Sequence, residues 1–344
     1  MSTRLLSRLL ALLIGFTLPA AAHADDPLFA SSDQLQITIK APLKTLFRNR
    51  QSDDKIAGTL TDTAGNPLPI TLKLRGITRR TSEVCDFPPL RVDFTSPPPA
   101  NSVFAGQKHI KLVTHCRNNG AFQQNVLLEY GAYRMYNVLT PHSFRVRLAN
   151  INYQDADGQP IVTRVGFFIE DLKDVAKRNG TVETHAPPRI TVANLAPADA
   201  GRYAMFQNLI ANHDWSMRAG PEGADCCHNA QLIGPLGPAS VIPIPYDFDF
   251  SGLVNAPYAT PPDELQLSSV RQRKYRGYCV NNAEALVAAR QMRAMRSQMY
   301  AALTSTPGMD PATQQRATSY LDGFFADDAS DADVQSKMLS RCLG

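Results

Sequence analysis

The chain reads Asn212-His213-Asp214-Trp215, then His228-Asn229, then Tyr246-Asp247-Phe248-Asp249. Carboxylate and amide oxygens suit hard cations such as Mg²⁺ or Mn²⁺. In phosphoryl transfer, one carboxylate takes the proton of the acceptor hydroxyl, while an amide and a second carboxylate hold the metal that neutralises phosphate charge. The order of these residues therefore predicts Asp214 as a catalytic base and Asn229, Asp247 and Asp249 as metal ligands, with the rest of the fold built around them.

A purely structural interpretation of these residues is also open. Aspartates beside aromatic residues and glycine are common in turns, and any one of the residues alone fits a turn. The ordered set of an acid, an amide and a paired acid is more specific than any member. The metal site is therefore the working hypothesis.

The N-terminus has the pattern of a secretory signal. Arg4 and Arg8 form a positive start, an apolar run covers residues 9–18, and Ala22-His23-Ala24 has the small residues of a cleavage site. The apolar run is too short to span a bilayer, and no later segment is long and uncharged enough to do so. We expect an exported protein, periplasmic or secreted, that is cleaved near Ala24 and has no transmembrane segment.

The charge of the chain gives no support to a nucleic-acid partner. Removing Arg4 and Arg8 with the signal lowers the formal net charge of +4 by two. The sequence also has no basic block interleaved with aromatic residues, which nucleic-acid binding proteins often use. We therefore expect no nucleic-acid partner, and the sequence does not define an oligomeric state.

The six cysteines of an exported chain predict disulfides rather than free thiols. No CxxC pair is present, so a zinc site is not expected. Cys226 and Cys227 are adjacent, and we expect them to bond to separate partners because bridged residues usually lie further apart. The spacing does not choose among the other pairings. The cysteines are Cys85, Cys116, Cys226, Cys227, Cys279 and Cys342.

The first half of the mature chain has the pattern of β-strands. Residues 35–39 and 70–74 alternate apolar and polar side chains with period two, and residues 90–94 and 109–113 are further strands. Residues 165–169 form an apolar run typical of a strand inside a sheet. We take the end of this run as the boundary between a mainly antiparallel first part, residues 25–168, and a second part, residues 169–344.

The second part has the pattern of helices. Residues 197–211 have proline in the first turn and an apolar stripe, and they deliver Asp214 to the proposed site. Residues 283–303 repeat alanine, methionine and leucine at intervals of three and four, so we expect one long helix with a methionine stripe in the core. Two shorter helices are expected near residues 311–324 and 331–339.

Several charged residues of the first part are candidates for nucleotide contact. Arg75 begins a loop, residues 75–81, that combines glycine, hydroxyls and three arginines, which suits phosphate groups. Arg91 and Lys111 lie on strands with their apolar neighbours on the opposite face. Glu129 lies on an expected helix, residues 124–138, from which it can orient a basic strand residue. A solvated turn, solvent-facing strands and a water-facing helix are the alternatives.

The chain resembles the spore coat protein H (CotH) family of atypical kinases, in its secreted bacterial branch. The match covers about residues 72–279 and depends on the order of its pieces. They are Leu74-Arg75-Gly76, Pro89-Leu90-Arg91-Val92-Asp93-Phe94, the strand at residues 108–113, the helix around Glu129, the stretch ending at Glu170, Asn212-His213-Asp214, His228-Asn229 and Tyr246-Asp247-Phe248-Asp249.

The resemblance implies a two-lobed protein-kinase-like fold of the α+β class, with an antiparallel-sheet N-lobe and a mainly helical C-lobe. It implies ATP with Mg²⁺ or Mn²⁺ and transfer of phosphate to protein hydroxyls. By position it implies Asp214 as base, Asn229 and Asp247 as metal ligands, and Glu170, with Arg75 and Lys111, as nucleotide contacts. Phe87-Pro88-Pro89 stands where the family has lysines.

Two other functions remain open from the sequence. The missing family lysines also suit a binding module of the cell envelope that has lost catalysis. A metal-dependent hydrolase with two metals is a further alternative, because imidazoles lie beside carboxylates in the same stretch. Its ligands would be His213, Asp214, His228, Asp247 and Asp249.

Overall fold

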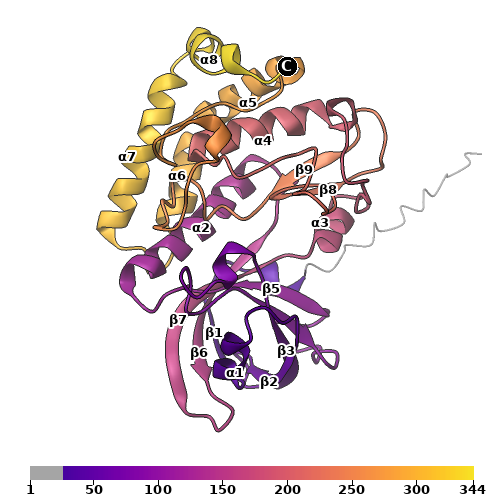
Figure 1. The fold of residues 1–344 in the computed structure, drawn as a ribbon, viewed down its shortest axis with the longest axis vertical. Helices are drawn as coiled ribbons and strands as arrows, with labels where there is room; N and C mark the ends of the chain where they lie inside the picture. Colours follow the sequence, from indigo (N-terminus) through magenta and orange to yellow (C-terminus); the bar gives the residue numbers. More distant parts are fainter. Residues whose placement is uncertain (1–25) are drawn as a thin grey trace, which may run out of the picture.

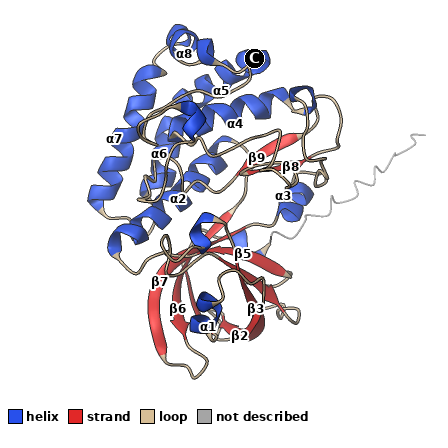
Figure 2. Cartoon of the chain, viewed as in Figure 1, coloured by secondary structure: helices blue, strands red, loops and turns tan. Residues whose placement is uncertain are grey.

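The structure is a computed structural model and describes residues 26–344. The expected secretion signal lies outside the described residues. Figure 1 shows a β-barrel at one end of the molecule and a group of helices at the other, and Figure 2 shows that strands are concentrated in the barrel. No described helix is both long and apolar enough to cross a membrane.

Seven strands close into one barrel in the order β1-β2-β3-β4-β5-β7-β6. β1 pairs with β6 in parallel, and every other neighbouring pair is antiparallel. The parallel pair joins strands far apart in the chain, so the barrel has no unpaired edge. The strands are Leu35–Lys40 (β1), Ile56–Thr61 (β2), Pro67–Leu74 (β3), Leu90–Phe94 (β4), His109–Val113 (β5), Val146–Gln154 (β6) and Pro160–Ile169 (β7).

The barrel interior is filled by alternate residues of its strands, as period-two sequences require. Ile39, Leu72, Leu112 and Ile151 are completely buried there. The strands predicted at residues 35–39, 70–74, 90–94, 109–113 and 165–169 are all confirmed.

The helical part holds most of the α-helices and one small β-hairpin. The α-helices of the described residues are Leu43–Arg48 (α1), Gly120–Leu139 (α2), Leu172–Arg178 (α3), Pro197–Ile210 (α4), Asn282–Ala294 (α5), Arg296–Thr304 (α6), Pro311–Asp327 (α7) and Asp331–Lys337 (α8). The hairpin strands are Ala230–Ile233 (β8) and Ile242–Pro245 (β9), and short 3-10 helices cover Pro27–Phe29, Thr78–Arg80, Val192–Asn194, Asp263–Leu265, Cys279–Asn281 and Leu339–Arg341.

The expected two-lobed kinase-like fold with an antiparallel-sheet N-lobe is wrong. The strand-rich part is a closed barrel of mixed pairing. The helix α2 comes from the middle of the strand-rich sequence, yet it packs with the helices in one hydrophobic core that also includes the ends of β5 and β7. Alternation along a strand defines its buried face but not its partner, so the sequence did not reveal the closure.

The expected long helix at residues 283–303 is interrupted. α5 ends at Ala294 and α6 begins at Arg296, with Met295 between them in a non-helical conformation. Met292 and Met299 are nonetheless completely buried, which confirms that the methionine stripe belongs to the core. The helices expected near residues 311–324 and 331–339 are confirmed as α7 and α8.

All six cysteines form disulfides, which is compatible with an exported protein. Cys85 bonds to Cys116 and Cys279 bonds to Cys342. The expectation of separate partners for Cys226 and Cys227 is wrong, because these neighbours bond to each other. Their α-carbons are 3.0 Å apart, closer than the separation on which the expectation depended.

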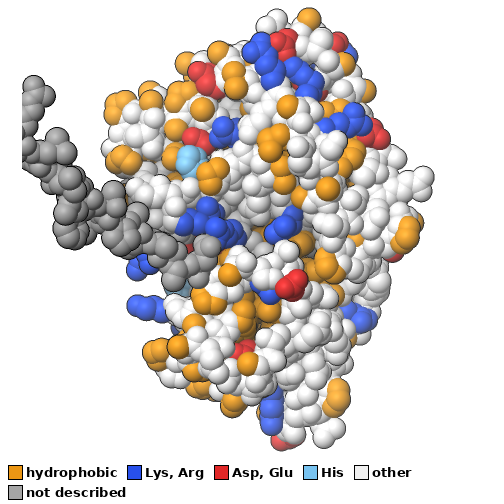
Figure 3. Space-filling view, turned by 180° about the vertical axis from the view of Figure 1, so that it is seen from behind, with side chains coloured by type: hydrophobic (Ala, Val, Ile, Leu, Met, Phe, Trp, Pro, Cys, Tyr) orange, Lys and Arg blue, Asp and Glu red, His pale blue; other side chains and the backbone are white. Residues whose placement is uncertain are grey.

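Charged side chains are dispersed over one face of the molecule. In the view of Figure 3, Lys and Arg side chains lie in separate small groups, with hydrophobic and uncharged atoms between them. This face therefore carries no continuous basic stripe.

Candidate metal and phosphate site

Three carboxylates from two distant segments meet between the barrel and the helices. Glu129 lies on α2, and Asp247 and Asp249 lie on the loop after β9. One ligand oxygen from each lies within 4.8 Å of the other two, a spacing that allows all three to share a metal ion. Among residues 26–344, this is the only group of three or more His, Cys, Asp or Glu side chains with that property.

Aromatic packing holds the loop of Asp247 and Asp249 in place. Phe248, between the two aspartates, is completely buried and lies 4.6 Å from the ring centre of Tyr133. The backbone N–H of Asp247 donates a hydrogen bond of 2.8 Å to the Tyr133 hydroxyl. Asp247 has a left-handed backbone with φ of 61°, a conformation that costs free energy for a non-glycine residue and that aspartate tolerates better than most. One buried ring therefore positions both carboxylates.

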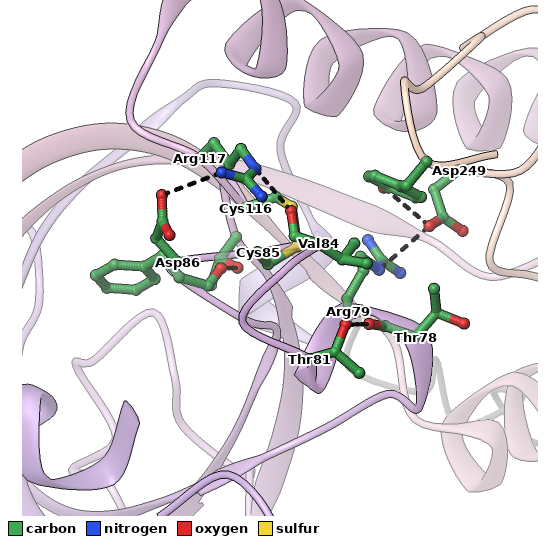
Figure 4. The surroundings of a disulfide bond; sticks show 12 residues. Thr78, Arg79, Thr81, Val84, Cys85, Asp86, Cys116, Arg117 and Asp249 are labelled. Carbon is green, nitrogen blue, oxygen red and sulfur yellow. Dashed lines mark hydrogen bonds and ion pairs between the residues drawn. A yellow bond between two sulfur atoms is a disulfide. The ribbon is translucent and has the colours of Figure 1, made fainter. Parts of the chain in front are cut away.

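The guanidinium of Arg79 lies inside this acidic cluster. Its Nη2 is 2.5 Å from Asp247 Oδ1, its Nε is 3.2 Å from Asp249 Oδ2, and its Nη1 is 3.4 Å from Glu129 Oε2. Arg79 comes from the 3-10 turn after β3 and is only 8% exposed. Figure 4 shows it pointing from that turn towards Asp249. A cation from the barrel thus already occupies part of the space between the carboxylates.

The electrostatics of the cluster favour a further positive charge. Burial raises the pKa of Glu129 and of Asp249, and the nearby Arg79 only partly opposes this effect. Burial alone would lower the pKa of Arg79, but Asp249, Asp247 and Glu129 outweigh it and raise that pKa. The raised pKa values mean that these carboxyl groups retain protons in the absence of metal. A divalent cation that displaced the protons would neutralise the two net negative charges of three carboxylates and one guanidinium.

Glu129 also has an oxygen that the described residues leave without a partner. Its Oε1 is buried and makes no hydrogen bond, and a buried unpaired acceptor costs free energy. A cavity of about 10 Å³ lies beside it, lined by Arg79, Thr114, Asn125, Asp249 and Tyr258 among others. Such a volume holds about one water molecule or a small ion. The unpaired oxygen and the adjoining space fit a cation bound on this cluster.

Asp214 and Asn229 form a second group, held together by their own hydrogen bonds. The Asn229 amide donates to Asp214 Oδ2 at 2.9 Å and to the Asp214 carbonyl at 2.7 Å. His228 Nε2 lies 2.6 Å from Asp214 Oδ1, and this hydrogen bond raises the pKa of His228. Asn229 is therefore paired with the proposed base, whereas Asp247 and Asp249 lie with Glu129.

Lys111 and Arg75 lie near Asp247 from the barrel side. Burial first and then Arg75 lower the pKa of Lys111 to about 8. The ammonium nitrogen of Lys111 is 5.3 Å from the ring centre of Tyr246, the residue before Asp247. Burial lowers the pKa of Arg75, while Asp247 is the strongest influence that raises it. Both cations are therefore half-buried groups that suit contact with an anion near Asp247.

Arg91 and Glu170 have other partners in the structure. Arg91 Nε donates to Asp93 Oδ1 at 2.7 Å on the same strand. Glu170 is 1% exposed, and each of its carboxylate oxygens is bonded. Oε1 accepts from Arg178 Nε at 2.9 Å, and Oε2 accepts from the backbone N–H of Arg145 at 2.8 Å. Glu170 thus fixes the junction where β7 leads into α3.

Arg79 is the site residue that the sequence analysis missed. The loop at residues 75–81 was identified by its three arginines, and Arg75 was selected at the strand end. Nothing in the spacing distinguishes Arg79, because two of its three carboxylate partners lie 50 and 168 positions away, and the third, Asp249, lies further still. Glu129 is expected to orient a basic strand residue, but its partner Arg79 lies on the 3-10 turn after β3 instead.

The fold and site together define a protein with a closed barrel, a helical part and a buried acidic cluster that encloses an arginine. No protein-family model matches the chain, and no curated protein matches it.

Proposed function

We propose that the chain is an exported, metal-dependent phosphotransferase that moves phosphate from a nucleotide such as ATP to protein hydroxyls. The observation that carries this proposal is the convergence of Glu129, Asp247 and Asp249 around Arg79, beside Lys111. Carboxylates with an unpaired buried oxygen suit Mg²⁺ or Mn²⁺, and fixed cations beside them suit phosphate oxygens.

In this proposal Asp247, Asp249 and Glu129 would hold the metal, which would supply positive charge for the phosphates. Lys111 would bind phosphate oxygens, Arg75 would support it with its charge, and Arg79 holds the three carboxylates in place. Asn229 holds the Asp214 carboxylate through its amide rather than by binding metal, given its two hydrogen bonds to that residue. The resemblance to the CotH family assigns ATP and a protein acceptor, and it remains part of the proposal.

Asp214 acts as the base. It takes the proton of the acceptor hydroxyl while the acceptor oxygen forms a bond to the terminal phosphorus, and the bond from that phosphorus to the bridging oxygen breaks, so the nucleoside diphosphate leaves. His228 and Asn229 fix the carboxylate for this step through hydrogen bonds of 2.6 and 2.9 Å.

The test is incubation of the purified mature chain with labelled ATP and Mn²⁺, together with the variant Asp247→Asn. We expect label on protein from wild type and little from the variant, because an amide contributes no charge to the metal site. The control is Asp54→Asn, which removes an exposed carboxylate far from the site in sequence. Equal labelling by wild type and Asp247→Asn would refute the proposal.

A binding module without catalysis is the second candidate, and one observation favours it. Arg79 already neutralises part of the acidic cluster, so the carboxylates have a cation in the absence of metal. Calorimetry separates the two candidates, because binding of ATP with Mn²⁺ but no labelling would support the module. The metal-dependent hydrolase loses support, because His213 and His228 belong to no metal-binding group of the described residues.

A further inference from the structure

A short basic segment lies against the loop that carries Asp214. The segment is Arg271-Gln272-Arg273-Lys274-Tyr275-Arg276, with four cations in six residues. This density of positive charge stands out in a chain whose formal net charge is only +4. We refer to Arg271, Arg273, Lys274 and Arg276 as the basic segment.

Contacts on both sides of Asp214 fix the segment in place. Arg276 donates a hydrogen bond to the carbonyl of His213, the residue before Asp214. Its guanidinium also lies 5.1 Å from the ring centre of Trp215, the residue after Asp214. His213 Nε2 is in turn 2.8 Å from the carbonyl of Gln272. The basic segment therefore lies directly beside the proposed base.

Aromatic stacking and carbonyl groups hold the other cations. The guanidinium carbons of Arg271 and Arg273 lie 4.3 and 4.1 Å from the ring centre of Tyr320 on α7. The Tyr320 hydroxyl donates to the Arg271 carbonyl at 2.9 Å, and Arg273 donates to the Tyr320 carbonyl at 2.7 Å. Such stacking restrains a guanidinium while leaving its charge intact.

Among residues 26–344, no carboxylate forms a salt bridge with the basic segment. The hydrogen bonds of its four cations all go to backbone carbonyls, those of Gly252, Leu209, Tyr320, Leu265 and His213. Glu264 is the carboxylate that most raises the pKa of Arg276, although burial lowers that pKa overall. Glu264 itself is exposed to solvent. Arg271 is exposed, and Arg273, Lys274 and Arg276 are partly exposed, so positive charge reaches the surface here without a carboxylate partner among the described residues.

We propose that the basic segment binds the acceptor through acidic residues that flank its phosphorylated hydroxyl. This inference rests on the proposed function, because it takes the partner to be the phosphate acceptor and places it beside Asp214. An extended run of cations suits an extended acidic peptide, since each guanidinium can hold one carboxylate through two parallel hydrogen bonds. Complementary charge of this kind selects a partner and increases its rate of association.

The experiment measures peptide binding and phosphate transfer separately on the mature chain. A fluorescent peptide with one serine flanked by glutamates is compared with the same peptide carrying glutamines, and anisotropy gives the dissociation constants. We expect the glutamate peptide to bind more tightly at low salt and to lose that advantage at high salt. The variant Arg271→Gln with Lys274→Gln should weaken its binding about tenfold.

The control is Lys108→Gln with Lys177→Gln, which removes two exposed charges elsewhere and should leave peptide binding unchanged. Equal affinity for the two peptides, or no loss in the variant of the basic segment, would overturn the inference. It would also be overturned if ATP displaced the peptide and the variant weakened ATP binding by the same factor, because the segment would then be a nucleotide site. Charge-dependent peptide binding without any phosphate transfer would support the docking surface while refuting the phosphotransferase.

Discussion

Arg79 Nη2 lies 2.5 Å from Asp247 Oδ1, although the two residues are 168 positions apart in the chain. The contact joins the turn after β3 to the loop after β9, and Glu129 of α2 completes the group. A buried arginine surrounded by three carboxylates stabilises the fold only while the charges balance. One guanidinium does not balance three ionised carboxylates, so a divalent cation has a place to bind here.

Replacing Arg79 should therefore make the stability of the protein depend on metal. In Arg79→Gln the three carboxylates lose their guanidinium, and we expect a loss of about 3 kcal/mol in the free energy of unfolding at neutral pH. Mn²⁺ should recover part of this loss and raise the Tm of the variant more than that of wild type. Thermal unfolding with and without Mn²⁺ measures both effects.

Arg80→Gln is the matched control, because Arg80 is the next residue and pairs with the exposed Asp53. It should change the Tm little and should not alter the response to Mn²⁺. If Mn²⁺ fails to raise the Tm of Arg79→Gln, the acidic cluster is not a cation site.

Asp214→Asn should reduce phosphate transfer without weakening nucleotide binding. An amide cannot take the proton of the acceptor hydroxyl, so we expect kcat to fall by about 10²- to 10⁴-fold with the KM for ATP nearly unchanged. The Asp199–His142 pair offers a control with similar chemistry, because His142 Nδ1 lies 2.9 Å from Asp199 Oδ1. Asp199→Asn should retain activity in proportion to its folded fraction, and a large rise in KM with Asp214→Asn would contradict the role of a base.

The Cys85–Cys116 disulfide should support the site as well as the fold. It encloses a sequence separation of 31 residues and anchors the segment that follows Arg79 (Figure 4). Replacing both cysteines by serine should cost about 3 to 4 kcal/mol of stability and should also weaken Mn²⁺ binding, because Arg79 and its turn become less restrained.

The Cys279–Cys342 disulfide, with a separation of 63 residues, is the comparison. Replacing it with serines should destabilise the chain by a similar amount while leaving Mn²⁺ affinity unchanged. Calorimetry at a temperature where both variants are folded measures the difference. An equal effect of the two replacements on Mn²⁺ affinity would show that the loss is general.

His115 should make the protein less stable in mild acid. It is 1% exposed and packs 4.5 Å from the ring centre of Phe87. Burial, with a smaller effect of Arg164, lowers its pKa from 6.5 to about 3. Between these values only the unfolded chain binds the proton, so stability is full above pH 6.5 and falls as the pH decreases, by at most about 1.4 kcal/mol per pH unit.

Urea unfolding at several pH values measures this dependence. His115→Phe keeps a ring against Phe87 and removes the titration, so its stability should fall less steeply with acid than that of wild type. Replacing the exposed His185 by Phe should leave the wild-type slope unchanged. A His115→Phe slope identical to that of wild type would show that another group causes the acid sensitivity.

The positions of most elements follow from the sequence, whereas their arrangement does not. The alternation of residues 70–74 and 109–113 predicted β3 and β5 correctly, because side chains on a strand alternate between its faces. The pairing of β1 with β6 was not predicted. Alternating side chains show which face of a strand is buried, but they do not show which other strand it pairs with. The break at Met295 was missed because the apolar period continues across it.

In the candidate site, too, the residue types could be predicted from the sequence, but their grouping could not. The residue types of Asp214, Asn229 and Asp247 were chosen for their chemistry, and all three lie on loops that the helices and hairpin position. Their grouping was not foreseen. Asn229 joins Asp214, while Glu129 joins Asp247 and Asp249, because α2 packs against the loop after β9 through Tyr133 and Phe248.

By itself the sequence determined five of the seven barrel strands, most of the helices and the carboxylates and cations available for chemistry, because these follow from periodicity and from functional groups along the chain. Only the tertiary structure decided that the barrel closes, and that Arg79 rather than Arg75 enters the acidic cluster. The physical reason is that both depend on contacts between segments more than a hundred residues apart, whose partners are selected by packing and charge balance in the folded state.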